Sequence, residues 1–322
     1  MKNKCLSSEF LFQLEKMRTT RPALVHEISD ILNMDENSVY RRLRGAVKFS
    51  VDEIGKLARH YHLSLDELLS AYPEGGYEAW KMDLLLIADK DGLDPDAIER
   101  NIPLINEFPN SQCTELGGSL GSLTRHFYMH HKHLWRFMHF KWGRYYSNVN
   151  TYSSFDAVQI SPKLADLFEV HLSRWKNIKY AFFIWDSLIF QKLVNDIRYY
   201  KSMDLLTEEN VLLIKQDIIE LLDVCEKAAI EGRCRDIVER FEIYISPINI
   251  DTSQVYLRYG EHWNYSIEVH GIRPIITSKP NVCKEFSQSI NRLKNASVLI
   301  SKSAERERRR FFNQQYELLN SL

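Results

Sequence analysis

The fold of the N-terminal part of this chain is decided by residues 22–69, PALVHEISDILNMDENSVYRRLRGAVKFSVDEIGKLARHYHLSLDELL. Leu24, Ile28, Ile31 and Leu32 recur at the spacing that places apolar side chains on one face of a helix. The segment therefore predicts a first helix that buries this face against the rest of a small domain.

A second helix is predicted over residues 36–44. Asp35 is a favourable N-cap, because its carboxylate can accept from the free N–H groups of the first turn. Val39 and Leu43 lie four residues apart and supply the apolar face, and Gly45 is the residue type favoured just past a helix end. The pattern predicts two helices joined by a tight turn.

Further helices surround this pair. Residues 50–53 and 64–67 are both capping boxes, in which a serine and a glutamate three residues later satisfy each other's free N–H groups. Upstream of residue 22, an apolar face is formed by Phe10, Leu11, Leu14 and Met17. We therefore expect five short helices within the first 71 residues, a plausible size for a small domain.

This order of helices and caps resembles the lambda-repressor-like, or XRE-type, helix-turn-helix family. The resemblance rests on VHEISDILNMDENSVYRRLRG and on the downstream FSVDEIGKLARHYHLSLDELL, and it covers about the first quarter of the chain. The turn departs from the family pattern, with Asn33-Met34 where a glycine is common. The resemblance implies a DNA-binding domain whose second motif helix enters the major groove.

The side chains outside the apolar stripe of residues 36–44 then have expected roles. Asn37 matches the edge of adenine, and Arg41 or Arg42 matches the O6 and N7 acceptors of guanine. Arg44 and Lys48 are expected on phosphate, which positions a domain without reading sequence. The predicted DNA-binding residues are Asn37, Ser38, Tyr40, Arg41, Arg42, Arg44 and Lys48.

The charge of this domain permits another interpretation. Residues 1–70 carry eleven lysines and arginines against ten aspartates and glutamates. A nearly neutral domain has little nonspecific affinity for DNA, and helix-turn-helix units also serve as protein docking modules. The clustering of basic residues at 41–48 nevertheless favours DNA binding.

The length, net charge and cysteine content of the whole chain indicate its general class and its cellular compartment. It has 322 residues and a formal net charge of −1, with five scattered cysteines and no C-x-x-C pair. These features predict a cytoplasmic protein of two or three domains with reduced cysteines. No apolar run is long enough to span a membrane, and no apolar signal core opens the sequence.

Beyond the first domain, Pro73 and Gly75-Gly76 indicate a linker at residues 72–76. Helices are predicted at 77–88, 123–146, 162–177, 179–200, 207–231, 282–295 and 304–319. Period-2 alternation from residue 241 onward predicts three or four strands. The predicted architecture is mainly α, with a helical body at 77–240 and an α+β module at 241–322 built on a small antiparallel sheet.

Candidate chemistry in the body is sparse. His126, His130 and His133 would share one stripe of a single helix, but no H-E-x-x-H motif accompanies them. The glycines of TELGGSLGS (114–122) lack the Lys and Ser/Thr of a phosphate loop and are interpreted as a hinge. Neither a catalytic site nor a cofactor is therefore predicted.

We predict a sequence-specific transcription regulator that binds double-stranded DNA, most simply as a homodimer. The body would supply dimerisation, sensing of an unidentified effector, or both. The alternatives are a docking module that does not bind DNA and a metal-dependent enzyme with a DNA-targeting head.

Overall fold

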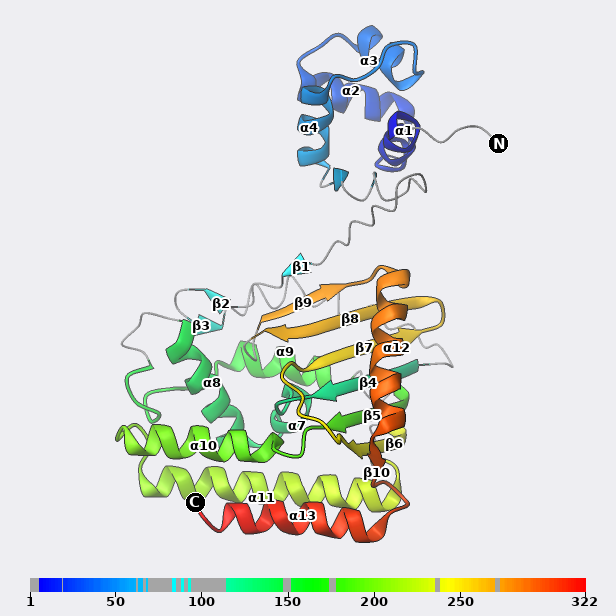
Figure 1. Cartoon of the computed structure of the whole chain (residues 1–322). Coiled ribbons are helices and arrows are strands. Elements are labelled where there is room, and N and C mark those ends of the chain that lie inside the picture. The colour runs from blue at the N-terminus through cyan, green and yellow to red at the C-terminus, as the bar shows by residue number, and fades with distance from the viewer. Residues whose placement is uncertain are drawn as a thin grey trace. The chain divides into compact units, whose positions relative to one another are not determined.

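The computed structural model describes residues 6–18, 20–61, 63–65, 68, 83–84, 88–89, 92–93, 114–146, 152–173, 178–234, 238–269 and 273–322 (Figure 1). The chain divides into two compact units, Met1–Lys81 and Met82–Leu322. They are called here the N-terminal unit and the C-terminal unit.

The described part of the N-terminal unit contains the helices α1 (Leu6–Lys16), α2 (Arg21–Leu32), α3 (Glu36–Leu43) and α4 (Val51–His60). Their shared core contains Phe10, Leu14, Leu24, Val25, Ile28, Val39, Leu43 and Leu57, all less than 5 % exposed. The capping box predicted at the start of α4 is present, with Ser50 and Glu53 bonded reciprocally. The capping box predicted at 64–67, and with it the fifth helix, lies largely outside the described residues.

A mixed sheet dominates the C-terminal unit. Its strands run in the order β1-β9-β8-β7-β4-β5-β6-β10. They are β1 (Asp83–Leu84), β4 (Thr114–Leu120), β5 (Ile178–Trp185), β6 (Val238–Ile245), β7 (Gln254–Tyr259), β8 (His262–Val269), β9 (Arg273–Thr277) and β10 (Val298–Leu299). The central strands β4, β5 and β6 are parallel, and the flanking strands pair antiparallel. The prediction of a small antiparallel sheet within residues 241–322 is therefore wrong, because the strands of this region belong to a larger mixed sheet that includes β4 and β5.

Several segments that were predicted as helix or hinge contain strands in the structure. Residues 179–185 were expected in a helix and belong to β5, and the expected hinge at 114–122 contains β4. The strand β1 (Asp83–Leu84) lies where a helix over 77–88 was expected, and β2 (Ala88–Asp89) begins at the last residue of that expected helix. The short β2 pairs with β3 (Gly92–Leu93) outside the main sheet. The body is thus organised around strands that pair across long sequence distances.

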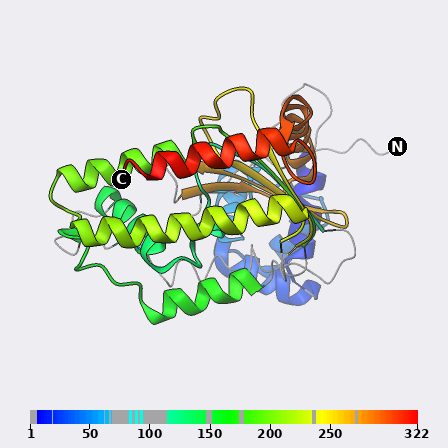
Figure 2. The same ribbon diagram turned by 90° about the horizontal axis from the view of Figure 1, so that it is seen from below.

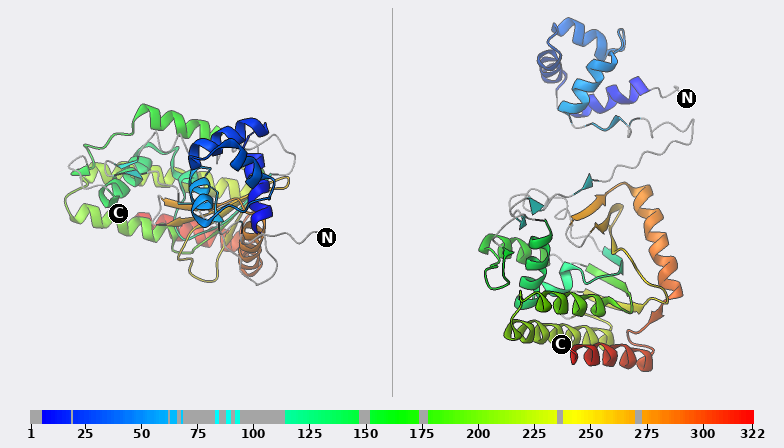
Figure 3. Two further views of the ribbon diagram at one scale, coloured as in Figure 1. Left: turned by 90° about the horizontal axis from the view of Figure 1, so that it is seen from above. Right: turned by 60° about the vertical axis from the view of Figure 1, so that its left-hand side comes forward.

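Helices cover both faces of the sheet. One face carries α7 (Arg125–Tyr128), α8 (Lys132–Tyr146), α9 (Pro162–Ser173), α10 (Ile189–Ser202), α11 (Glu208–Glu231) and α13 (Glu305–Leu319). The other face carries α12 (Pro280–Ala296), which packs on the strands opposite α8 and α10 (right-hand view of Figure 3). The main core lies on the multi-helix face and contains the fully buried Trp185, Phe190 and Phe312.

The basic C-terminal helix packs on its own unit. In Figure 2, α13 lies beside α11 along much of its length, and the two are in contact. Phe311 and Phe312 are buried, and the Arg308 guanidinium donates to the carbonyls of Ile300 and Ser303. Arg308 is therefore held inside the unit. Among the described residues, no helix is long and apolar enough to cross a membrane.

Candidate nucleic-acid interface

The turn between α2 and α3 is fixed by local hydrogen bonds. Asn33 ends α2 with φ 52° and ψ 53°, a left-handed conformation that asparagine tolerates better than most residues. The Met34 N–H donates to the Ser29 carbonyl, and the Ser29 hydroxyl donates to the Met34 carbonyl. Asn33 thus supplies the left-handed residue of the turn, at a position where glycine is common in the family that this sequence resembles.

Asp35 caps α3 as predicted. Its carboxylate accepts from the backbone N–H of Ser38 at 2.9 Å and from the Ser38 hydroxyl at 2.7 Å. These two hydrogen bonds hold the pKa of Asp35 below its ordinary value. The Ser38 hydroxyl is therefore committed to the cap, although the sequence had assigned it to DNA.

Three of the predicted DNA-binding residues form a single exposed stripe. Each helical residue advances about 100°, so Asn37, Arg41 and Arg44 fall within an arc of about 60°. All three are exposed, and the buried Val39 and Leu43 face the opposite direction. The stripe that we call the α3 ridge, defined as Asn37, Arg41 and Arg44, is available to a partner.

Two further predicted residues flank the α3 ridge. Lys48 is exposed in the segment between α3 and α4. Tyr40 is partly buried, and its backbone carbonyl accepts from Arg44 Nε at 3.3 Å. Lys48 thus remains open to phosphate contact.

Arg42 has a different environment from its neighbour Arg41. Its guanidinium donates to Glu53 twice, from Nε at 3.1 Å and from Nη2 at 2.9 Å. The two side chains are only 20 % and 17 % exposed. Because Glu53 also accepts from the Ser50 N–H at 2.8 Å, the pair joins α3 to the capping box of α4.

The charge of Glu53 is stabilised by these contacts. Burial alone would raise the pKa of its carboxyl, but the hydrogen bonds from Arg42 and the Ser50 N–H outweigh it and hold the pKa below its ordinary value. Arg42 is accordingly a structural residue in the free protein. Sequence reasoning missed this because Glu53 lies eleven residues away, on another helix.

Glu27 forms a second polar junction in the unit. It accepts from Arg18 at 2.5 Å, and the His60 ring lies 3.2 Å away at the end of α4. Burial would raise the pKa of Glu27, but the His60 and Arg18 hydrogen bonds keep it below its ordinary value. These contacts link the segment after α1 and the end of α4 to α2, the helix that precedes α3.

Comparison with known protein families gives a match over the N-terminal part of the chain. Residues 6–99 match the BetR domain. This domain is associated with helix-turn-helix DNA-binding regulators, so the match indicates a DNA-binding regulatory role for the N-terminal region. No curated protein and no solved structure matches the chain.

The histidine stripe predicted for residues 123–146 is altered by the fold. The expected single helix is broken after Tyr128, which places His126 on α7 and His133 on α8. In the part of the chain that the structure describes, no group of three or more His, Cys, Asp or Glu side chains has the arrangement of a metal site.

Proposed function

We propose that this protein is a sequence-specific DNA-binding transcription regulator of the lambda-repressor-like type, acting by binding and not by catalysis. The α3 ridge carries the proposal, because it presents one amide and two guanidinium groups to solvent from a helix whose opposite face is buried. The BetR match of residues 6–99 supports the same role.

In the proposed complex α3 lies in the major groove. Asn37 is suited to a bidentate contact with adenine and Arg41 to one with guanine. Arg44 and Lys48, farther along the chain, are suited to phosphate, which sets the register of the domain. Arg42 fixes α3 against the start of α4 through its pair with Glu53, so its contribution to DNA binding is indirect.

The C-terminal unit is proposed to supply dimerisation. Domains of this type usually bind as dimers to half-sites about one helical turn apart, because a single head has low affinity. A homodimer is therefore the proposed state on DNA, and effector sensing is a further proposed task of the C-terminal unit.

Selection of duplexes from a random pool tests the proposal. The full chain would be run beside Arg41→Ala and, as the matched control, Arg59→Ala, which removes an exposed arginine from α4. We expect a two-fold-symmetric motif that Arg59→Ala retains. Arg41→Ala should lose about 1–3 kcal/mol of discrimination at one base position.

The salt dependence separates specific from nonspecific binding. If recovered duplexes show no motif, and all three proteins share the same salt-sensitive background, the regulator proposal fails. A protein partner of the N-terminal unit would then be sought instead.

A further inference from the structure

A cavity of about 400 Å³ lies within the C-terminal unit, beside the carboxyl ends of β4 and β5. Its described lining comes from the segment after β4, from α8 and α10, from the loop before β7, and from β8. The carboxyl ends of parallel strands are where α/β sheets commonly bind ligands, and this volume suits a small molecule.

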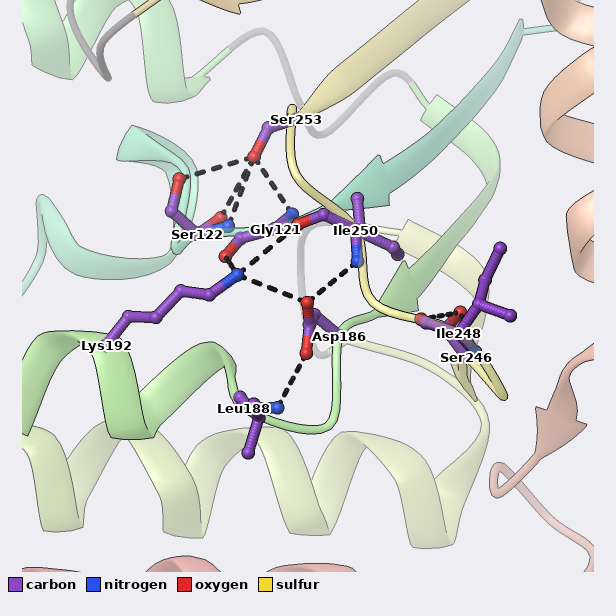
Figure 4. Close-up of polar contacts among 9 residues, drawn as sticks. All are labelled: Gly121, Ser122, Asp186, Leu188, Lys192, Ser246, Ile248, Ile250 and Ser253. Atoms are coloured by element: carbon purple, nitrogen blue, oxygen red, sulfur yellow. Dashed lines mark hydrogen bonds and ion pairs between the residues drawn. The ribbon is translucent and has the colours of Figure 1, made fainter.

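A polar network adjoins the cavity (Figure 4), and three of its members, Ser122, Lys192 and Ser253, belong to the lining. The buried Asp186 carboxylate accepts from the N–H groups of Leu188 and Ile250, each at 2.8 Å, and from Lys192 Nζ at 3.2 Å. The Ser253 hydroxyl accepts from the N–H groups of Gly121 and Ser122, each at 3.2 Å. These bonds join the ends of β4 and β5 to the loop before β7, at one side of the cavity.

Both lysines of the lining are already engaged. Lys192 Nζ donates to the carbonyls of Gly121 and Ile250 and to the Asp186 carboxylate, so all three N–H groups of the ammonium are used. Lys141 Nζ pairs with Asp196 across the cavity wall. Neither ammonium is therefore free to attract an anionic ligand.

Two acids of the lining, Glu268 and Asp251, have no such partner in the part of the chain that the structure describes. Among the described residues, none donates a hydrogen bond to the Glu268 carboxyl or forms an ion pair with it, and Arg125 acts on it only electrostatically. Asp251 also belongs to the lining, is exposed, and likewise has no ion-pair partner among the described residues. The remaining lining includes an apolar wall formed by Leu123, Met138, Trp142, Ile189 and Leu193.

We propose that this cavity binds a small molecule with a protonated amine and a short apolar body, the ammonium pairing with Glu268. The apolar wall would bury the body of the ligand, and Ser122 and Asp251 lie in the same lining for a second polar contact. The described lining lies entirely in the C-terminal unit, so ligand binding there is independent of whether the N-terminal unit binds DNA.

The affinity is expected to depend on pH through Glu268. Burial raises the pKa of its carboxyl to about 7, with Arg125 partly offsetting the effect. An ammonium pairs with the ionised form, so binding releases a proton and strengthens as pH rises. With a pKa of about 7, affinity should fall about tenfold from pH 8 to pH 6.

The ionisable groups that face Glu268 come from α7 and from the lining of the cavity. Arg125 and Tyr128 on α7 interact with it electrostatically, and burial raises the pKa of Tyr128 further above its ordinary value. The other charged groups of the described lining are Lys141, Asp196, Lys192 and Asp251, and none is a histidine. Glu268 is thus the expected source of a transition near neutral pH.

Calorimetric titration of the full chain, without DNA, tests the proposal. The probes are two matched series: 2-phenylethylamine, 2-phenylethanol and 3-phenylpropionate, and hexylamine, hexanol and hexanoate. We expect the amine of each series to bind at least about tenfold more tightly than its neutral and anionic analogues, because only the amine forms a charge-assisted hydrogen bond.

Variants locate the contact. Glu268→Gln should abolish the preference for the amine and the pH dependence, while Glu209→Gln, an exposed acid at the start of α11, should leave both unchanged. The pH series on the unmodified chain needs no variant and holds even if Glu268→Gln misfolds. Equal binding of amine and alcohol, a flat pH profile, or no binding of either amine at millimolar concentration would overturn the proposal.

Discussion

Replacement of Arg42 by alanine separates the two roles that adjacent arginines play in α3. Arg42 is held by Glu53 in a nearly enclosed pair, whereas Arg41 is exposed. An exposed ion pair contributes about 0–1 kcal/mol, and breaking a buried one costs about 3–5 kcal/mol. With about one fifth of each side chain exposed, we expect Arg42→Ala to destabilise the α3–α4 region by about 2 kcal/mol.

Hydrogen exchange of the full chain measures this loss where it occurs. A cost of about 2 kcal/mol increases the open population about 30-fold, so amides of α3 and α4 should exchange about 30-fold faster in Arg42→Ala. Arg41→Ala is the matched control and should leave exchange unchanged. Exchange within twofold of the wild type in Arg42→Ala, or an equal acceleration in Arg41→Ala, would refute the structural role of Arg42.

The same pair has a definite acid dependence. The pKa of Glu53 is lowered in the folded state, so its contribution is complete above the ordinary glutamate pKa and is lost as pH falls through the lowered value. The difference between wild type and Arg42→Ala should therefore shrink in acid. A difference that persists undiminished at pH 2 would assign the effect to packing of the arginine stem.

Three other predictions concern separate parts of the chain. Lys48→Ala should weaken binding to all duplexes by a similar factor and reduce the salt slope by about 1 in titrations at several salt concentrations. Burial lowers the pKa of His139 to about 4, so below pH 6.5 the unfolded chain binds more protons and stability is lost as pH falls. We therefore expect the unfolding free energy of the wild type to fall by about 2.5 kcal/mol relative to His139→Gln between pH 7 and pH 4.5. Urea titration at the two pH values measures this difference. Only this difference isolates His139, because the raised pKa of Glu268 contributes with the opposite sign. Gly121→Ala would place a Cβ 2.1 Å from the Ile250 carbonyl oxygen and should cost about 1–3 kcal/mol in the same urea assay, whereas a hinge at this position would tolerate alanine.

The N-terminal helices were predictable because their signals are local. Asp35 and Ser50 each precede a helix and bond to residues three positions later, which the sequence spacing displays directly. The exposed face of α3 follows from the same periodicity. The partner of Arg42 does not, because a contact between two helices depends on how they pack, and periodicity defines each helix alone.

The sheet was harder to predict because its signals are ambiguous and its pairings are distant. Residues 181–185, AFFIW, are apolar and buried on both faces, since β5 is covered by helices on each side. A continuous apolar run is equally compatible with a buried helix. The parallel pairing of β5 with β4 and β6 joins residues about 60 positions apart, and no local pattern records it.

The glycines of β4 show how the same residue type serves opposite purposes. Gly117 and Gly118 were interpreted as a flexible hinge, because glycine frees the backbone. In the sheet, a Cβ on Gly117 would lie 2.4 Å from Tyr256 and 2.6 Å from Phe182, two aromatic side chains in the core beneath α12. Glycine is required there because the rings occupy the space of its missing side chain, so the segment is closely packed and not a hinge. A glycine-rich run therefore predicts close approach as readily as flexibility, and the aromatic strands on either side, Phe182 on β5 and Tyr256 on β7, are what decide between the two.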